Sequence, residues 1–234
     1  GRSQPIAVHA LLVAINDALD NVNATILYRA FDEEFLPDAS ELAKLKYNID
    51  NNEVSALIIL AGNPVFDAPI DLDLAKVEDI VHLSSHVNET ALKSKWHVPQ
   101  AHFLESWGDA RAVDGTLGLI QPLIEPLHGG KSDVEFLNLI TTGRNDSDYD
   151  VVRETWRDIL PRREYDVAWP QVLHAGLLEE EQRYIVPFVQ ANGIRTTVKY
   201  YPLETQPLSE AILELNFKPS CHVFDGQYAN NAWL

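Results

Sequence analysis

The sequence has a single cysteine, Cys221, and no methionine among its 234 residues. One thiol cannot form an internal disulfide, and an iron–sulfur cluster or a cysteine zinc site needs several thiolates. The longest apolar run, residues 54–61, is much shorter than the roughly 20 residues of a membrane helix. We therefore expect no disulfide, no cysteine-ligated metal centre and no direct membrane insertion of this segment.

Basic residues are also scarce, with 18 Lys and Arg against 35 Asp and Glu, which gives a net charge of −17. This charge repels nucleic acid and anionic lipid, so neither is an expected partner. It suits a well-solvated acidic surface or docking on a basic partner. The chain opens on Gly-Arg-Ser-Gln without a methionine, so we expect a processed or excised piece of a longer protein.

Hydrophobic residues make up 46% of the chain and charged residues 23%, as in ordinary soluble globular proteins. Helical and strand-like patterns alternate over the first 140 residues. The predicted helices are residues 5–19, 38–48, 71–79, 89–96 and 132–140, and the predicted strands are 24–28, 54–60, 80–83, 102–104 and 117–120. This alternation predicts an α/β fold with a doubly wound, mostly parallel, Rossmann-like sheet, in which strand 54–60 is buried on both faces.

The pattern changes after Gly143, where residues 145–150 are polar and turn-like. We predict a sheet domain over residues 1–143 and a continuation of the same domain over residues 144–234, cut before the next domain. In that second part, residues 151–160 and 170–182 are predicted as helices, and residues 196–201 and 211–217 as strands.

The first candidate site is the turn Gly62-Asn63-Pro64, which directly follows the predicted strand 54–60. Ligands of doubly wound sheets bind beyond the carboxyl ends of the strands. Gly62 allows close approach of a ligand, Asn63 offers an amide, and Pro64 stiffens the turn. A plain strand-to-helix turn is the simpler interpretation of the same tripeptide.

The second candidate is the segment His82–Pro99, in which Asn88-Glu89-Thr90 lie at a predicted strand-to-helix junction. Such residues cap helices, and their amides and hydroxyls could also bind a phosphate or a heterocycle. The third is the predicted loop Glu105–Arg111, which includes Gly108 and Asp109, continued by Asp114-Gly115-Thr116 and Gln121-Pro122. Its carboxylates could do acid–base chemistry, or an Asp–Arg pair could simply hold the loop.

Other reactive residues do not form a recognisable motif. The eight histidines show no HExxH pattern, and a metal site made by this chain alone is not expected. The sequence has no G-x-S-x-G elbow, P-loop or G-x-G-x-x-G. Cys221 and His222 are adjacent, a spacing that usually points the two side chains apart, so we predict no catalytic residue.

Four segments together resemble the molybdopterin oxidoreductases. They are LAGNPVFDAP at residues 60–69, NETA at 88–91 leading to Val98-Pro99, HFLESWGDA at 102–110 with the Asp114-Gly115 and Gln121-Pro122 pairs, and DGQYANNAWL at 225–234. The third segment is most similar to the molybdopterin-oxidoreductase-like large subunit of bacterial alternative complex III, a quinol-oxidising membrane assembly. The likeness is weakest over residues 141–206.

The resemblance implies a much longer subunit with iron–sulfur clusters elsewhere, exported by a twin-arginine route to the periplasmic face of the inner membrane. Its partners would be iron–sulfur, haem and quinol-binding subunits of a respiratory complex. In catalytic members, segments matching Gly62-Asn63-Pro64 and Asn88-Glu89-Thr90 lie near a molybdopterin guanine dinucleotide. By the same resemblance Gly108 and Asp109 are candidate cofactor contacts.

Three functions remain open from the sequence. In the first, this is a scaffolding domain of a respiratory subunit that binds no molybdenum cofactor. In the second, it is the cofactor-holding domain of a catalytic bis-molybdopterin guanine dinucleotide oxidoreductase, where the cofactor does the redox chemistry and the protein positions it. In the third, it is a free-standing domain that binds a small ligand.

Overall fold

The computed structural model describes residues 4–29, 39–112, 114–179, 184–201, 218–226 and 233. The chain forms two compact units. The smaller one combines Gly1–Ala30 with Arg183–Leu234, and the larger one is Phe31–Gln182. Residue 143 lies inside the larger unit, and the boundary predicted there stays a prediction. No helix among the described residues is long and apolar enough to cross a membrane.

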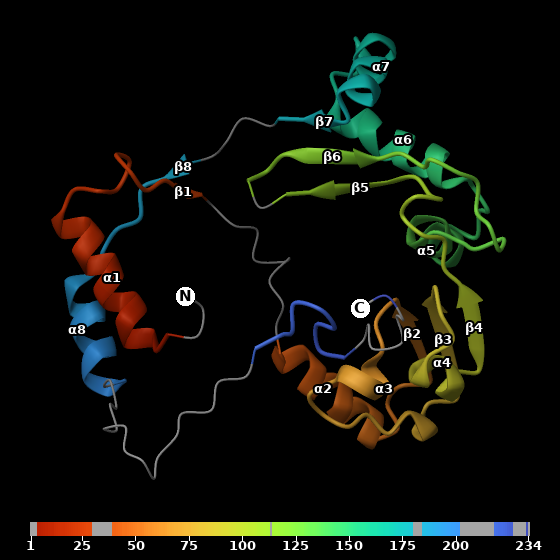
Figure 1. The fold of residues 1–234 in the computed structure, drawn as a ribbon, viewed down its shortest axis with the longest axis horizontal. Coiled ribbons are helices and arrows are strands. Elements are labelled where there is room, and N and C mark those ends of the chain that lie inside the picture. Colours follow the sequence, from red (N-terminus) through yellow and green to blue (C-terminus); the bar gives the residue numbers. More distant parts are fainter. Residues whose placement is uncertain are drawn as a thin grey trace. The chain divides into compact units, whose positions relative to one another are not determined.

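The smaller unit pairs two helices, α1 (Ile6–Ala18) and α8 (Ala191–Tyr200), beside a short antiparallel ribbon (Figure 1). The ribbon joins β1 (Tyr28–Arg29) to β8 (Tyr184–Ile185). The predicted helix at residues 5–19 is confirmed. The predicted strand at 24–28 is wrong over most of its length, because the Asn21 carbonyl accepts three backbone N–H groups, from residues 24, 25 and 26, and closes a turn.

Helix α8 corrects the strand predicted over residues 196–201. The run of β-branched residues and tyrosines there favours a strand by local propensity. The less exposed side chains of α8 are nevertheless Ile194, Thr197 and Val198, which have helical spacing. Packing of this face thus outweighs local preference. The strand predicted at 211–217 lies outside the described residues.

The larger unit contains a parallel sheet in the order β2-β3-β4 (Figure 1). Its strands are β2 (Ala56–Leu60), β3 (Asp79–Ser84) and β4 (Trp96–Pro99); the elements around them are α2 (Ala39–Asp50), α3 (Pro64–Asp67), the 3₁₀ helix η2 (Leu74–Lys76) and α4 (Glu89–Lys93). The structure thus confirms a mixed α/β fold with parallel strands. Strand β4 was missed because it follows directly on a helical pattern.

Strand β2 is not buried on both faces as predicted. Every second residue is exposed, including Ile58 and Leu60, because β2 lies at the edge of the sheet that the described residues form. Leu57 and Ile59 pack against a core cluster of Ile49, Leu74, Val77 and Ile80. A continuous apolar run predicts the strand but not how many layers cover it.

A second, antiparallel sheet in the order β5-β6-β7 completes the larger unit. Its strands are β5 (Gly108–Arg111), β6 (Leu117–Ile120) and β7 (Leu177–Leu178), with helices α5 (Asp133–Thr142), α6 (Asp148–Ile159) and α7 (Tyr165–Ala175). Ser132 and Glu135 form the predicted capping box of α5. Residues 102–104 are not the predicted strand, since Glu105 N–H donates to the His102 carbonyl and turns the chain.

Helix α6 is anchored on this sheet by Trp156, whose side chain is fully buried in a cluster with Trp169 and Tyr165. The indole Nε1 donates a hydrogen bond of 2.8 Å to Asp109 Oδ2 on β5. A buried indole N–H without an acceptor is destabilising, so Asp109 ties the helix to the sheet.

We predict that Asp109→Ala lowers the free energy of unfolding by about 1–2 kcal/mol, because Trp156 loses its acceptor. Asp109→Asn keeps an acceptor oxygen and should cost less. Chemical denaturation measures both. In a Trp156→Phe background, which has no indole N–H, Asp109→Ala should have little further effect; an equal cost in both backgrounds would contradict the assigned role.

Candidate functional site

The turn after β2 and the start of α4 meet at the carboxyl edge of the parallel sheet. Ala61 and Gly62 both have positive φ angles, 53° and 64°, which swing the chain sharply away from the strand. Asn63 then points its side chain at α4: its Oδ1 accepts hydrogen bonds from the Thr90 backbone N–H (3.1 Å) and the Thr90 hydroxyl (2.8 Å).

Three further hydrogen bonds join polar groups at this edge. Asn63 Nδ2 donates to Glu89 Oε2 at 2.6 Å, and the Val65 N–H donates to Thr90 Oγ1 at 3.1 Å. Asn88 Oδ1 caps α4 by accepting the Ala91 N–H at 3.0 Å. We call Gly62, Asn63, Val65, Asn88, Glu89 and Thr90 the rim network.

The rim network lowers the pKa of Glu89. The largest cause is the hydrogen bond from the Asn63 side chain, followed by one from its own backbone N–H. Both donors favour the carboxylate form. Glu89 therefore places a negative charge at the first turn of α4, where the positive end of the helix dipole favours it. An anionic ligand at the first turn of α4 would meet the Glu89 carboxylate, which is already hydrogen-bonded to Asn63.

His82 binds the backbone of the turn after β2. It lies on β3, is fully buried, and its Nε2 lies 3.2 Å from the Gly62 carbonyl and 3.3 Å from that of Ala61. Since a carbonyl only accepts, Nε2 carries the proton. Nδ1 is buried and has no hydrogen-bond partner among the described residues. Burial is the main cause that lowers the pKa of His82, opposed by the two carbonyls and aided by the charge of His97.

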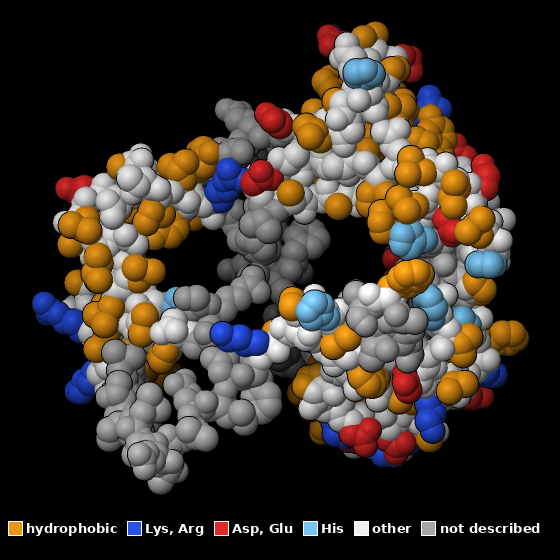
Figure 2. Space-filling model, viewed as in Figure 1, with side chains coloured by type: hydrophobic (Ala, Val, Ile, Leu, Met, Phe, Trp, Pro, Cys, Tyr) orange, Lys and Arg blue, Asp and Glu red, His pale blue; other side chains and the backbone are white. Residues whose placement is uncertain are grey.

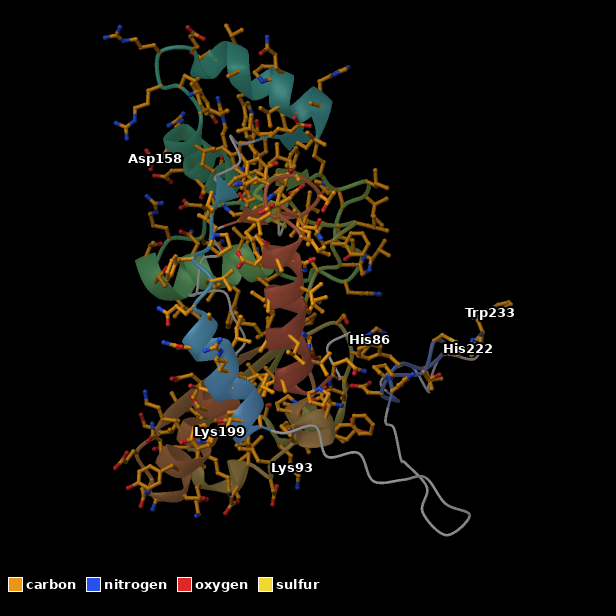
Figure 3. All side chains as sticks on the ribbon, turned by 90° about the vertical axis from the view of Figure 1, so that its left-hand side faces the viewer. His86, Lys93, Asp158, Lys199, His222 and Trp233 are labelled. Carbon is orange, nitrogen blue, oxygen red and sulfur yellow. The ribbon has the colours of Figure 1, made fainter. Side chains whose placement is uncertain are left out.

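The structure brings together most of the residues singled out in the sequence. Gly62, Asn63, Pro64, Asn88, Glu89 and Thr90 share the carboxyl edge of the sheet. Gly108 and Asp109 lie in the antiparallel sheet instead, where Asp109 is bound to α6. The two sheets are separate: in Figure 3, Asp158 on α6, the helix anchored on the antiparallel sheet, lies well away from Lys93 on α4, beside the parallel sheet. His82 begins the second candidate segment but was not predicted as a binding residue, although a histidine inside an apolar strand is a signal that could have found it.

A cavity of about 220 Å³ lies beside the rim network. It is lined by residues 64, 65, 68–72 and 74, of which only Asp71 is charged. Pockets for drug-sized ligands and cofactors usually have about 300–1,000 Å³. Among the described residues, no three His, Cys, Asp or Glu side chains are grouped to hold a metal ion. The volume of this cavity is therefore below the usual range for a cofactor, and its one charged side chain, Asp71, has the same sign as a nucleotide phosphate.

The rim residues do not fit a guanine dinucleotide as they stand. A pyrophosphate needs free backbone N–H groups or cations. Here the Thr90 and Ala91 N–H groups are taken by side chains of Asn63 and Asn88, and the rim network contains Glu89 but no Lys or Arg. The geometry supports a closed structural junction.

Comparison of the sequence with models of protein families found no match, and a search among curated proteins found no similar sequence. The resemblance to the molybdopterin oxidoreductases therefore stays a prediction.

We predict that Asn63→Ala lowers the free energy of unfolding by about 1–3 kcal/mol, because the buried N–H and hydroxyl of Thr90 lose their acceptor. Asn63→Asp keeps that acceptor but places a second carboxylate next to Glu89, and Glu89→Gln should restore part of its stability. Thermal and chemical denaturation of the three variants test this. A harmless Asn63→Ala would contradict the structural role of the rim network.

A second prediction concerns acid stability. The unfolded chain protonates His82 near its ordinary pKa of 6.5, whereas the folded chain resists protonation. The stability contribution of neutral His82 is therefore complete above that value and is lost as the pH falls from it towards the lower pKa of the folded state. Denaturation between about pH 8 and pH 5 should show a steeper loss in wild type than in His82→Phe. As a control, replacement of the exposed His128 by Gln should leave the pH dependence of the unfolding free energy as in wild type. The same pH dependence in wild type and His82→Phe would contradict the prediction.

Proposed function

We propose that this chain is a scaffolding domain of a molybdopterin-oxidoreductase-like subunit, within a membrane-associated respiratory complex that oxidises quinol. In this proposal the domain faces the periplasm, contacts iron–sulfur, haem and quinol-binding subunits, and holds no molybdenum cofactor. The supporting observation is that the segments expected beside a pterin dinucleotide bind each other, through Asn63, Glu89 and Thr90.

The polar groups of the rim network bind one another. A cofactor site keeps donors free for its ligand, and here the N–H groups of Val65, Thr90 and Ala91 are satisfied within the protein. The Glu89 carboxylate accepts the Asn63 Nδ2 donor, which is then not free for a phosphate oxygen. A junction of this kind holds α4 against the sheet, which is what a rigid support for neighbouring subunits requires.

The cofactor-holding domain of a catalytic oxidoreductase is the second candidate. One observation favours it, namely that both turns lie at the carboxyl edge of parallel strands, where open α/β sheets bind ligands. For a dinucleotide to bind, the rim network would have to open and Glu89 would have to leave Asn63.

The content of molybdenum and pterin in the purified full-length subunit separates the two candidates. We expect less than about one-tenth equivalent of each per subunit, measured by elemental mass spectrometry and by fluorescence of the oxidised pterin. Stoichiometric molybdenum or pterin would overturn the proposal. In that case Asn63→Ala should lower cofactor occupancy, while Asn192→Ala on the exposed side of α8 should leave it unchanged.

A further inference from the structure

Two loops of the larger unit present large apolar side chains to solvent. Phe103 and Leu104 lie on one loop, and Leu123, Ile124 and Leu127 on the other; we call these five residues the apolar patch. Leu123 is 77% exposed, Leu127 68% and Phe103 59%. Figure 2 shows hydrophobic side chains widely distributed on the visible surface, and single exposed ones are ordinary.

The apolar patch differs from scattered residues because hydrogen bonds hold its two loops together. The Leu104 carbonyl accepts the N–H of Leu123 at 2.8 Å and that of Ile124 at 3.2 Å. Gln121 Nε2 donates to the Leu173 carbonyl at 2.8 Å and fixes the second loop to α7. Loops whose backbone is already fixed lose little further backbone entropy on binding, which favours their use in an interface.

The charge beside the apolar patch restricts what can cover it. Residues 102–106 and 121–128 contain Glu105 and Glu125 but no Lys or Arg. A second copy of this chain would bring another net charge of −17, and an anionic membrane would also be repelled. A protein surface with an apolar centre and a basic border has the complementary charge.

We propose that the apolar patch is the docking face for a different protein chain that presents apolar side chains bordered by Lys or Arg. The inference rests on the proposed scaffolding function and assigns it a surface. The docking face depends on the loops at 102–106 and 121–128 and not on the rim network. The content of molybdenum and pterin therefore tests the proposed function, and protection of the apolar patch tests the docking face.

The first experiment compares the full-length subunit in its intact membrane complex with the same subunit after dissociation. Hydroxyl-radical labelling should oxidise Phe103, Leu123 and Leu127 at least about three-fold less in the complex, because a partner covers them. Equal labelling in both states would overturn the proposal. Protection already present in the dissociated subunit would also overturn it, because another part of the same chain would then cover the patch.

The second experiment uses Leu123→Glu/Leu127→Glu in the full-length subunit. Both side chains are exposed, so the thermal unfolding of the subunit should be unchanged, while its affinity for the other subunits should fall at least about ten-fold. The matched control is Leu92→Glu, since Leu92 on α4 is also 77% exposed but lies outside the patch. Loss of affinity in the control, or none in the double variant, would contradict the docking face.

The charge of the partner is tested by Glu125→Lys. If the border of the partner is basic, this variant should associate more slowly at low salt, and the difference should shrink as salt is added. Faster association would overturn the proposed charge complementarity. Concentration-dependent dimerisation of the dissociated subunit through the patch, or its binding to anionic phospholipid vesicles, would identify a different occupant and also overturn the proposal.

Discussion

The Asn63 side chain is the interaction on which the carboxyl edge of the parallel sheet depends. Strand β2 ends in a turn with two successive positive φ angles, and nothing in the strand itself fixes the direction of the chain beyond it. An amide can accept and donate at once, so Asn63 binds both Thr90 and Glu89. A hydroxyl at this position is too short to reach both, and a carboxylate would repel Glu89.

This arrangement links the two crossover connections of the sheet. The turn before α3 is tied to the start of α4, and His82 on the strand between them holds the same turn through its carbonyls. Thr90 and His82 are both fully buried, so their polar contacts are protected from competition by water, whereas the hydrogen bond between Asn63 and Glu89 is exposed. Loss of one member leaves buried polar groups of the others unpaired, which makes the network cooperative.

Local signals predicted those elements that local interactions stabilise. The capping box at Ser132 and Glu135 and the helical spacing of residues 5–19 were sufficient for α5 and α1. The strands failed where distant partners decide: β4 exists because it pairs with β3, and residues 196–201 are helical because Ile194 and Val198 share a face. The meeting of both turns followed from parallel strands, but the pairing of Asn63 with Thr90, 27 residues later, could not be derived from either segment alone.

Glu89 gives the clearest physical distinction between a binding edge and a supporting one. At the carboxyl edge of a parallel sheet, helix N-termini and turn amides form a region that favours an anion. In this chain the anion is part of the protein, because the Glu89 carboxylate is held by Asn63 and by its own backbone N–H, which is why its pKa is lowered. An external phosphate would have to displace a covalently tethered carboxylate whose effective concentration is high. The fold geometry that offers a cofactor cleft in open α/β sheets here carries hydrogen bonds that fasten the start of α4 to the turn after β2.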